Sequence, residues 1–218
     1  QINILFKHDL MKRFSEKLIN FNILLAFFII IWGAWVRLSG SGAGCGDHWP
    51  LCNGEVIPLE PSIKTLIEYV HRITSGFFGI TVFISFLLSR KLFLPNSMGR
   101  KSATATLVFT ITEALIGAVL VKKGLVVDNS SIMRAWVIGF HLINTFLLLA
   151  SLTSQAYFSS RFSYQKQKVE NKINYLIYVI FIVFLIVGAT GSISALGNTL
   201  LSKETSKFIN SRKILNNF

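Results

Sequence analysis

The sequence has few charged residues, and acidic residues are especially scarce. Asp, Glu, Lys and Arg together make up 15% of the 218 residues, and only 10 residues are acidic. Cysteine occurs only twice, so thiolates alone do not make a metal site. In contrast, 52% of the residues are hydrophobic and the mean hydropathy is +0.56, far from an ordinary soluble domain. The composition therefore indicates a membrane protein.

Long segments without charge predict where the chain crosses the membrane. The first has 19 uncharged residues between Lys17 and Arg37, enough to span a bilayer. The third carries only Glu113, and the fourth carries no charged residue. The five predicted spans are 18–36, 66–88, 103–121, 135–157 and 173–190. We therefore expect an all-α integral membrane protein: a four-helix transmembrane bundle plus a fifth transmembrane segment.

Basic residues predict the orientation. If the N-terminus lies inside, twelve Lys and Arg residues flank the inner ends of the spans, against five in the two outer loops. The positive-inside rule then makes 1–17 an inner N-terminal tail and 37–65 an outer loop. Four basic residues beyond residue 202 would lie outside and do not fit this rule. Contact with lipid headgroups explains the net charge of +12 better than nucleic acid does, so no nucleic-acid partner is expected.

Two histidines lie inside the predicted spans at similar depth. His71 and His141 are each about five or six residues from the outer ends of the second and fourth spans. Ionisable residues within a membrane are costly and often functional. Two facing imidazoles can ligate a haem iron, whereas zinc usually needs more protein ligands. The sequence therefore predicts a bis-imidazole haem site; the alternative is that each histidine hydrogen-bonds a neighbouring helix.

Carboxylates and basic residues accompany these histidines. Glu68 shares a helical face with His71, so it could hold an imidazole N–H, transfer a proton, stabilise developing positive charge, or pair with an arginine. Glu113, on the third span, either lines the pocket or makes an interhelical hydrogen bond. The residues that could contact haem propionates or line the pocket are Arg37, Arg72, Arg134, Glu113 and Asn144.

The first outer loop contains both cysteines. Cys45 and Cys52 have six residues between them and would face the oxidising side of the membrane. A disulfide is therefore expected. A redox-active thiol pair stays open, because an exposed disulfide can exchange electrons.

Two sequence motifs resemble those of the heme A synthase family. Val36–Gly54 contains Gly-Cys-Gly-Asp-His-Trp-Pro-Leu-Cys, and residues 68–72 read Glu-Tyr-Val-His-Arg. Ile116–Leu120 and His141 fit the same pattern, and the resemblance covers about residues 20–200. It implies an oxidoreductase that converts a methyl group of haem O to the formyl group of haem A, for cytochrome oxidase biogenesis.

The resemblance also implies two similar four-helix halves. The positions matching Glu68, His71 and His141 line the substrate-haem pocket of the first half, and the pair matching Cys45 and Cys52 is disulfide-bonded or redox-active. Residues 18–160 would form this haem-binding half, and 161–218 a fifth helix, a tail and the start of an incomplete second half. Haem b is expected in that second half. No histidine follows His141, so we expect a chain that alone does not complete the oxidation: a fragment, a prematurely ended reading frame or one part of a split protein.

The mechanistic hypothesis places haem O between His71 and His141, with its methyl group near Glu68 as the catalytic carboxylate. Two other functions stay open: a non-enzymatic bis-His b-type cytochrome, and a membrane thiol–quinone oxidoreductase using Cys45 and Cys52.

Expected partners are membrane lipid, haem O, haem O synthase and a second copy of the chain. A composition rich in Lys, Asn and Ile, without a transit peptide, favours a bacterial plasma membrane, with the N-terminus cytoplasmic and the cysteine-bearing loop outside.

Overall fold

Four long helices make up the described part of the protein. The structure is a computed structural model that describes residues 2–126, 129, 131–160, 182–183 and 186. The helices are α1 (Ile2–Leu38), α2 (Ile63–Leu92), α3 (Met98–Lys122) and α4 (Ile132–Ser160). Each is long and apolar enough to cross a membrane, and no strand occurs among the described residues. The predicted all-helical membrane fold is confirmed for this part of the chain.

The four helices contain the first four predicted spans and extend beyond them. Residues 2–17, predicted as an inner tail, continue α1 without a break, and Lys12 and Glu16 pair along this part of the helix at a spacing of four residues. The predicted fifth span, 173–190, lies outside the described residues except for 182, 183 and 186. So does the rest of the predicted incomplete second half, 161–218.

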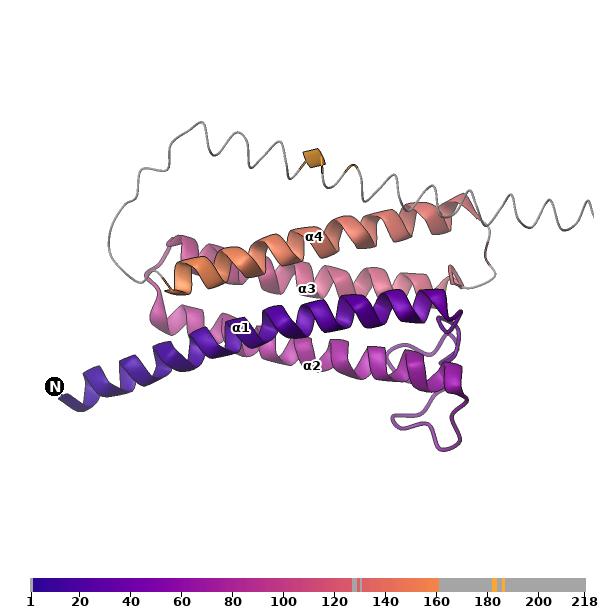
Figure 1. Ribbon diagram of the computed structural model, residues 1–218, viewed down its shortest axis with the longest axis horizontal. Helices are drawn as coiled ribbons and strands as arrows, with labels where there is room; N and C mark the ends of the chain where they lie inside the picture. The colour runs from indigo at the N-terminus through magenta and orange to yellow at the C-terminus, as the bar shows by residue number, and fades with distance from the viewer. Residues whose placement is uncertain (1, 127–128, 130, 161–181, 184–185, 187–218) are drawn as a thin grey trace, which may run out of the picture.

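The helices form an antiparallel ring. α1 packs against α2 and α4, and α3 packs against the same two helices (Figure 1). α2 and α4 therefore occupy diagonal corners and run in the same direction. Side chains that point inward from these two helices face each other across the interior, which is the arrangement that a ligand held between them requires.

Serine caps and a tight turn set the helix ends near the loops. The Ser62 hydroxyl accepts a hydrogen bond from the Thr65 amide at 3.2 Å, and Ser97 does the same for Arg100 at 3.4 Å. α3 ends before Gly124, whose φ of 59° favours glycine. The Ser62 cap fixes where α2 begins, and therefore how far His71 lies along the helix.

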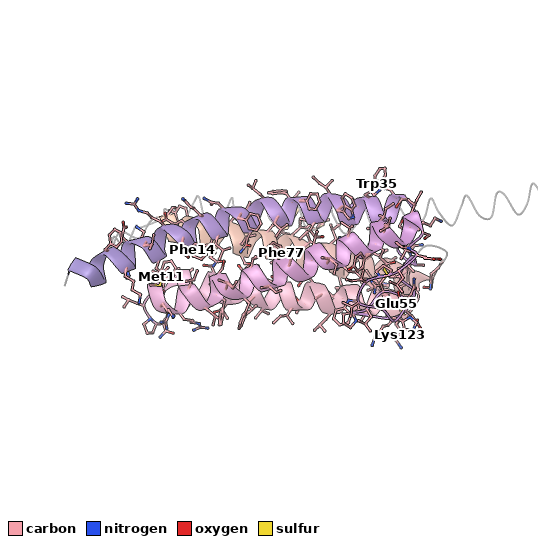
Figure 2. All side chains as sticks on the ribbon, turned by 90° about the horizontal axis from the view of Figure 1, so that it is seen from below. Met11, Phe14, Trp35, Glu55, Phe77 and Lys123 are labelled. Carbon is pink, nitrogen blue, oxygen red and sulfur yellow. A yellow bond between two sulfur atoms is a disulfide. The ribbon has the colours of Figure 1, made fainter. Side chains whose placement is uncertain are left out.

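The apolar core lies in the half of the bundle away from the cysteine-bearing loop. Its buried members are Ala26, Phe78, Val82, Leu148 and Leu152. Large apolar side chains also cover the outer surface, among them the exposed Phe14, Trp35 and Phe77, which are labelled in Figure 2. Such a surface suits contact with lipid, where apolar exposure carries no hydrophobic penalty.

Candidate functional site

The two predicted histidines lie at matched depth on diagonal helices. His71 is eight residues beyond the first residue of α2, and His141 is nine beyond the first residue of α4. Both helices start at the same end of the ring, which also holds the cysteine-bearing loop. The fold therefore places both histidines near the same end of the bundle, on two parallel helices that lie diagonally across it.

Glycines of the neighbouring helices face both imidazoles. A Cβ added to Gly33 of α1 would stand 3.0 Å from Cε1 and 3.4 Å from Nε2 of His71. A Cβ added to Gly117 of α3 would stand 4.0 Å from Cε1 of His141. Gly33 thus makes room for the His71 ring, a role that the sequence alone did not reveal because it depends on how α1 rotates against α2.

The donor set fits a haem better than a bare metal ion. The Nδ1 atoms of His71 and His141 are both buried and have no hydrogen-bond partner. An imidazole that makes no hydrogen bond through Nδ1 is not held in one orientation, so it can turn to present Nε2 to a bound group. Among the described residues, no group of three or more His, Cys, Asp or Glu side chains could hold a metal ion. Two imidazoles at matched depth on parallel helices suit a bis-imidazole haem iron.

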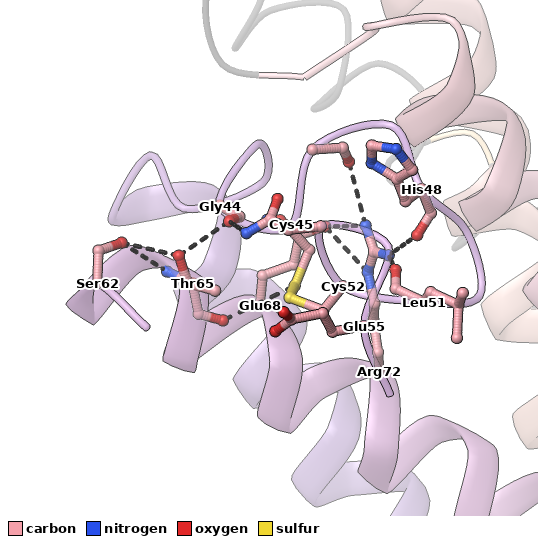
Figure 3. The surroundings of a disulfide bond; sticks show 12 residues. Gly44, Cys45, His48, Leu51, Cys52, Glu55, Ser62, Thr65, Glu68 and Arg72 are labelled. Atoms are coloured by element: carbon pink, nitrogen blue, oxygen red, sulfur yellow. Dashed lines mark hydrogen bonds and ion pairs between the residues drawn. A yellow bond between two sulfur atoms is a disulfide. The ribbon is translucent and has the colours of Figure 1, made fainter. Parts of the chain in front are cut away.

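Glu68, the predicted catalytic residue, faces the outer loop. Its side chain is buried, and its Oε2 accepts a hydrogen bond from the Cys45 amide at 2.8 Å (Figure 3). Its Oε1 accepts from Arg72, at 2.6 Å from Nη2 and 3.2 Å from Nε. Arg72 of α2 thus binds one carboxylate oxygen of Glu68, and the loop binds the other. Of the alternatives for Glu68, the ion pair with an arginine is the one present in the structure.

Arg72 joins the loop to the helix. Besides Glu68, its guanidinium donates to the carbonyls of Gly46, His48 and Leu51, at 3.4 Å from Gly46 and 2.9 Å from His48. All five N–H groups of a guanidinium are accounted for by these contacts. Arg72 therefore reaches the outer loop, and its predicted contact with a haem propionate would require some of these bonds to open.

The expected disulfide is present in the structure. Cys45 and Cys52 are joined by an S–S bond of 2.03 Å, and both are at most 1% exposed. The loop lies tight against α2, because a Cβ on Gly44 would come within 2.5 Å of the Lys64 carbonyl oxygen. The Thr65 hydroxyl also donates to the Gly44 carbonyl at 2.9 Å. The thiol-exchange alternative relied on an exposed bond, whereas this one is enclosed.

Glu113 lies beside His141. Its Oε1 is 3.5 Å from Nδ1 of His141, its Oε2 accepts from Asn144 at 2.6 Å, and its Oε1 accepts from Thr145. The spacing along the second span predicted a carboxylate, Glu68, beside His71; the structure has a carboxylate, Glu113, beside His141. The reason is that Glu68 is taken by Arg72, whereas no arginine or lysine within the described helices forms an ion pair with Glu113.

The remaining predicted contacts lie near the outer ends of the helices. Arg37 is exposed in the last turn of α1. Arg134, in the first turn of α4, donates to the Asn129 carbonyl at 2.8 Å. Asn144 donates to the Phe109 carbonyl at 2.8 Å and belongs to the α3–α4 contact around Glu113. Arg37 and Arg134 are therefore near the rim, and Asn144 is within the bundle.

Comparison with known proteins matches residues 16–218 to the COX15-CtaA family, described as cytochrome oxidase assembly protein. A protein named protoheme IX farnesyltransferase, from Thermus thermophilus, is 41% identical over 179 residues, which is 82% of this chain and 29% of that protein. Heme A synthases of Bacillus cereus and Bacillus anthracis are 40% identical over 114 residues, which is 52% of this chain and 37% of each enzyme. The chain thus spans about a third of the length of these curated relatives.

Proposed function

The chain belongs to the COX15-CtaA family of cytochrome oxidase assembly proteins, and from this premise we propose that its four helices form the substrate-haem half of a heme A synthase-like oxidoreductase. The reaction is oxidation of the methyl group of haem O to the formyl group of haem A. One observation supports the proposal: His71 and His141 lie at matched depth on the diagonal helices α2 and α4, with Gly33 leaving space against the His71 ring.

In this proposal the two imidazoles hold the iron of haem O. When bound, the porphyrin and its oxidant supply the redox chemistry, and the protein supplies binding, orientation and electrostatics. His71 and His141 would hold the iron between α2 and α4. Arg37 and Arg134, near the outer rim, are suited to pair with the carboxylates of the propionates.

Glu68 is proposed to act on the same substrate as a fixed negative charge. Its two oxygens are oriented by Arg72 and by the Cys45 amide, so the carboxylate would need no reorganisation to stabilise positive charge developing at the methyl group. A role in proton transfer would require Glu68 to exchange one of these bonds for the substrate. The glutamine variant separates these roles from a purely structural one, as described below.

The proposal also identifies the expected cofactor, the supplier of the substrate and the membrane. The described helices offer one pair of histidines at matched depth, so the haem b expected from the family resemblance would be bound outside this bundle. The similarity to a protein named for farnesyl transfer to protohaem supports haem O synthase as the supplier of substrate. The distribution of basic residues supports a cytoplasmic N-terminus with the disulfide loop outside, and a composition rich in Lys, Asn and Ile favours a bacterial plasma membrane.

The test is the reduced-minus-oxidised optical spectrum of the purified chain reconstituted with protohaem. We expect one low-spin haem per chain, lost in His71→Ala and in His141→Ala and retained in His48→Ala, which removes an exposed loop histidine. A parent protein without stoichiometric haem, or variants that keep the full spectrum, would contradict the site.

Product analysis separates the enzyme from a b-type cytochrome. In cells that make haem O and also supply the second, haem b-binding half, we expect membranes containing this chain to accumulate haem A, and Glu68→Gln to reduce it while leaving the haem spectrum in place. A cytochrome that only carries electrons would leave the haem composition unchanged in both. Dependence on Cys45 and Cys52 with indifference to both histidines would instead indicate the thiol–quinone oxidoreductase.

A further inference from the structure

We infer that Glu113 is a positioning residue for His141: its carboxylate accepts the Nδ1–H of the imidazole and so directs Nε2 toward the haem iron. The inference rests on the proposed function, since it assigns a role within the same site. Its starting point is geometric. Oε1 of Glu113 is 3.5 Å from Nδ1 of His141, and this buried nitrogen has no hydrogen-bond partner in the structure.

The contact needs only a small movement to become a hydrogen bond. A separation of 3.5 Å exceeds the usual 2.7–3.2 Å range for an N–H···O bond. A modest rotation of the imidazole closes this gap, and iron ligation supplies a reason for the ring to turn. A carboxylate that accepts the second N–H of a metal-bound histidine fixes both its tautomer and its orientation.

The carboxylate itself is held in place from α4. Asn144 donates to Oε2 of Glu113 at 2.6 Å, and the Thr145 hydroxyl donates to Oε1. Asn144 is fixed in turn by donating to the Phe109 carbonyl at 2.8 Å and accepting from Thr112 at 2.6 Å. A group held by donors on both oxygens cannot swing away from His141 freely, as a positioning role requires.

The two histidines are consequently unequal. His141 has a carboxylate at its Nδ1, whereas His71 has none, because Glu68 pairs with Arg72. A negative charge hydrogen-bonded to an axial imidazole makes it a stronger donor and favours ferric over ferrous iron. Glu113 should therefore lower the reduction potential of the bound haem. An interhelical hydrogen bond with no link to the iron would leave that potential unchanged.

The experiment measures the midpoint potential and ferric affinity of protohaem bound to the whole chain, for the parent and Glu113→Gln. Loss of a partner of this kind typically weakens metal affinity by about 10–100-fold. If the loss falls on the ferric form, each tenfold raises the potential by about 59 mV, the one-electron constant. The matched control is Glu60→Gln, which neutralises an exposed carboxylate of the outer loop.

Two further variants keep the test decisive if Glu113→Gln fails to insert. Thr145→Val removes one donor to the carboxylate but keeps its charge, and Glu113→Asp keeps the charge at a shorter reach. Both should raise the potential in the same direction by a smaller amount. A potential equal to that of the parent in every variant that binds haem would overturn the inference and leave the proposed function standing. Absence of haem from the parent would overturn the proposed function itself.

Discussion

At the scale of single residues, helical spacing predicted that both His71 and Arg72 lie next to Glu68, but not which of the two Glu68 would bind. Glu68 lies three residues before His71 and four before Arg72, so one face of α2 offers it both partners. The charged partner prevails, because a buried carboxylate is stabilised far more by a guanidinium than by a neutral ring. Glu113 and His141 lie on different helices, and no spacing rule relates them. Their contact follows from the rotation of α3 against α4.

Gly33 is the residue whose substitution should most directly disturb the site. Gly33→Ala places a methyl group 3.0 Å from the His71 ring, and overpacking of this kind costs about 1–3 kcal/mol. We expect protohaem affinity to fall roughly tenfold or more, since 1.4 kcal/mol is a factor of ten. Gly79→Ala on α2 is the control, because a Cβ there meets nothing within 4 Å. Equal affinities for the two variants would show that the ring is not held against α1.

At the scale of elements, the helices were predictable and the loop contacts were not. Uncharged segments long enough to span a bilayer predict helices because unpaired backbone groups are too costly in lipid. That argument correctly located 18–36, 66–88, 103–121 and 135–157. It did not predict that the helices continue past the charged residues that bound each span. Nor could it show that the loop is fastened to α2 through Arg72, since those acceptors are backbone carbonyls and carry no sequence signal.

The fastening of this loop can be tested through Arg72→Gln. The change leaves Glu68 buried without its ionic partner, and breaking a buried pair in this way typically costs about 3–5 kcal/mol. We expect Arg72→Gln to have a clearly lower Tm in detergent, measured by tryptophan fluorescence. Arg13→Gln breaks an ion pair of the same i,i+4 spacing that is exposed, 72% for Arg13 and 57% for Asp9. Its cost should stay within about 1 kcal/mol.

The double variant Glu68→Gln with Arg72→Gln completes this comparison. It removes the buried charge together with its partner, so it should be more stable than Arg72→Gln alone. If Arg72→Gln and Arg13→Gln lowered the Tm equally, the ion pair of α2 would be no more than a surface contact.

At the scale of the whole molecule, the two ends of the helix bundle differ in the residues that they carry. The disulfide loop, both histidines and Trp35 lie toward one end, and Met11 lies toward the other (Figure 2). Basic residues concentrate near the second end, at 7–17 and at the turn between α2 and α3. If that end faces the cytoplasm, the haem site opens toward the oxidising side, where the disulfide is stable.

The orientation can be measured with single introduced cysteines, because the chain has only two cysteines and both are in the disulfide. A membrane-impermeant maleimide should label Glu60→Cys, in the loop before α2, on intact cells. It should label Asn96→Cys, between α2 and α3, only after the membrane is permeabilised. The positive-inside asymmetry predicts this pattern, and the opposite one would put the histidines near the cytoplasmic face. Labelling of both positions on intact cells would mean that α2 does not cross the membrane, which would remove the parallel α2–α4 pair on which the haem site depends.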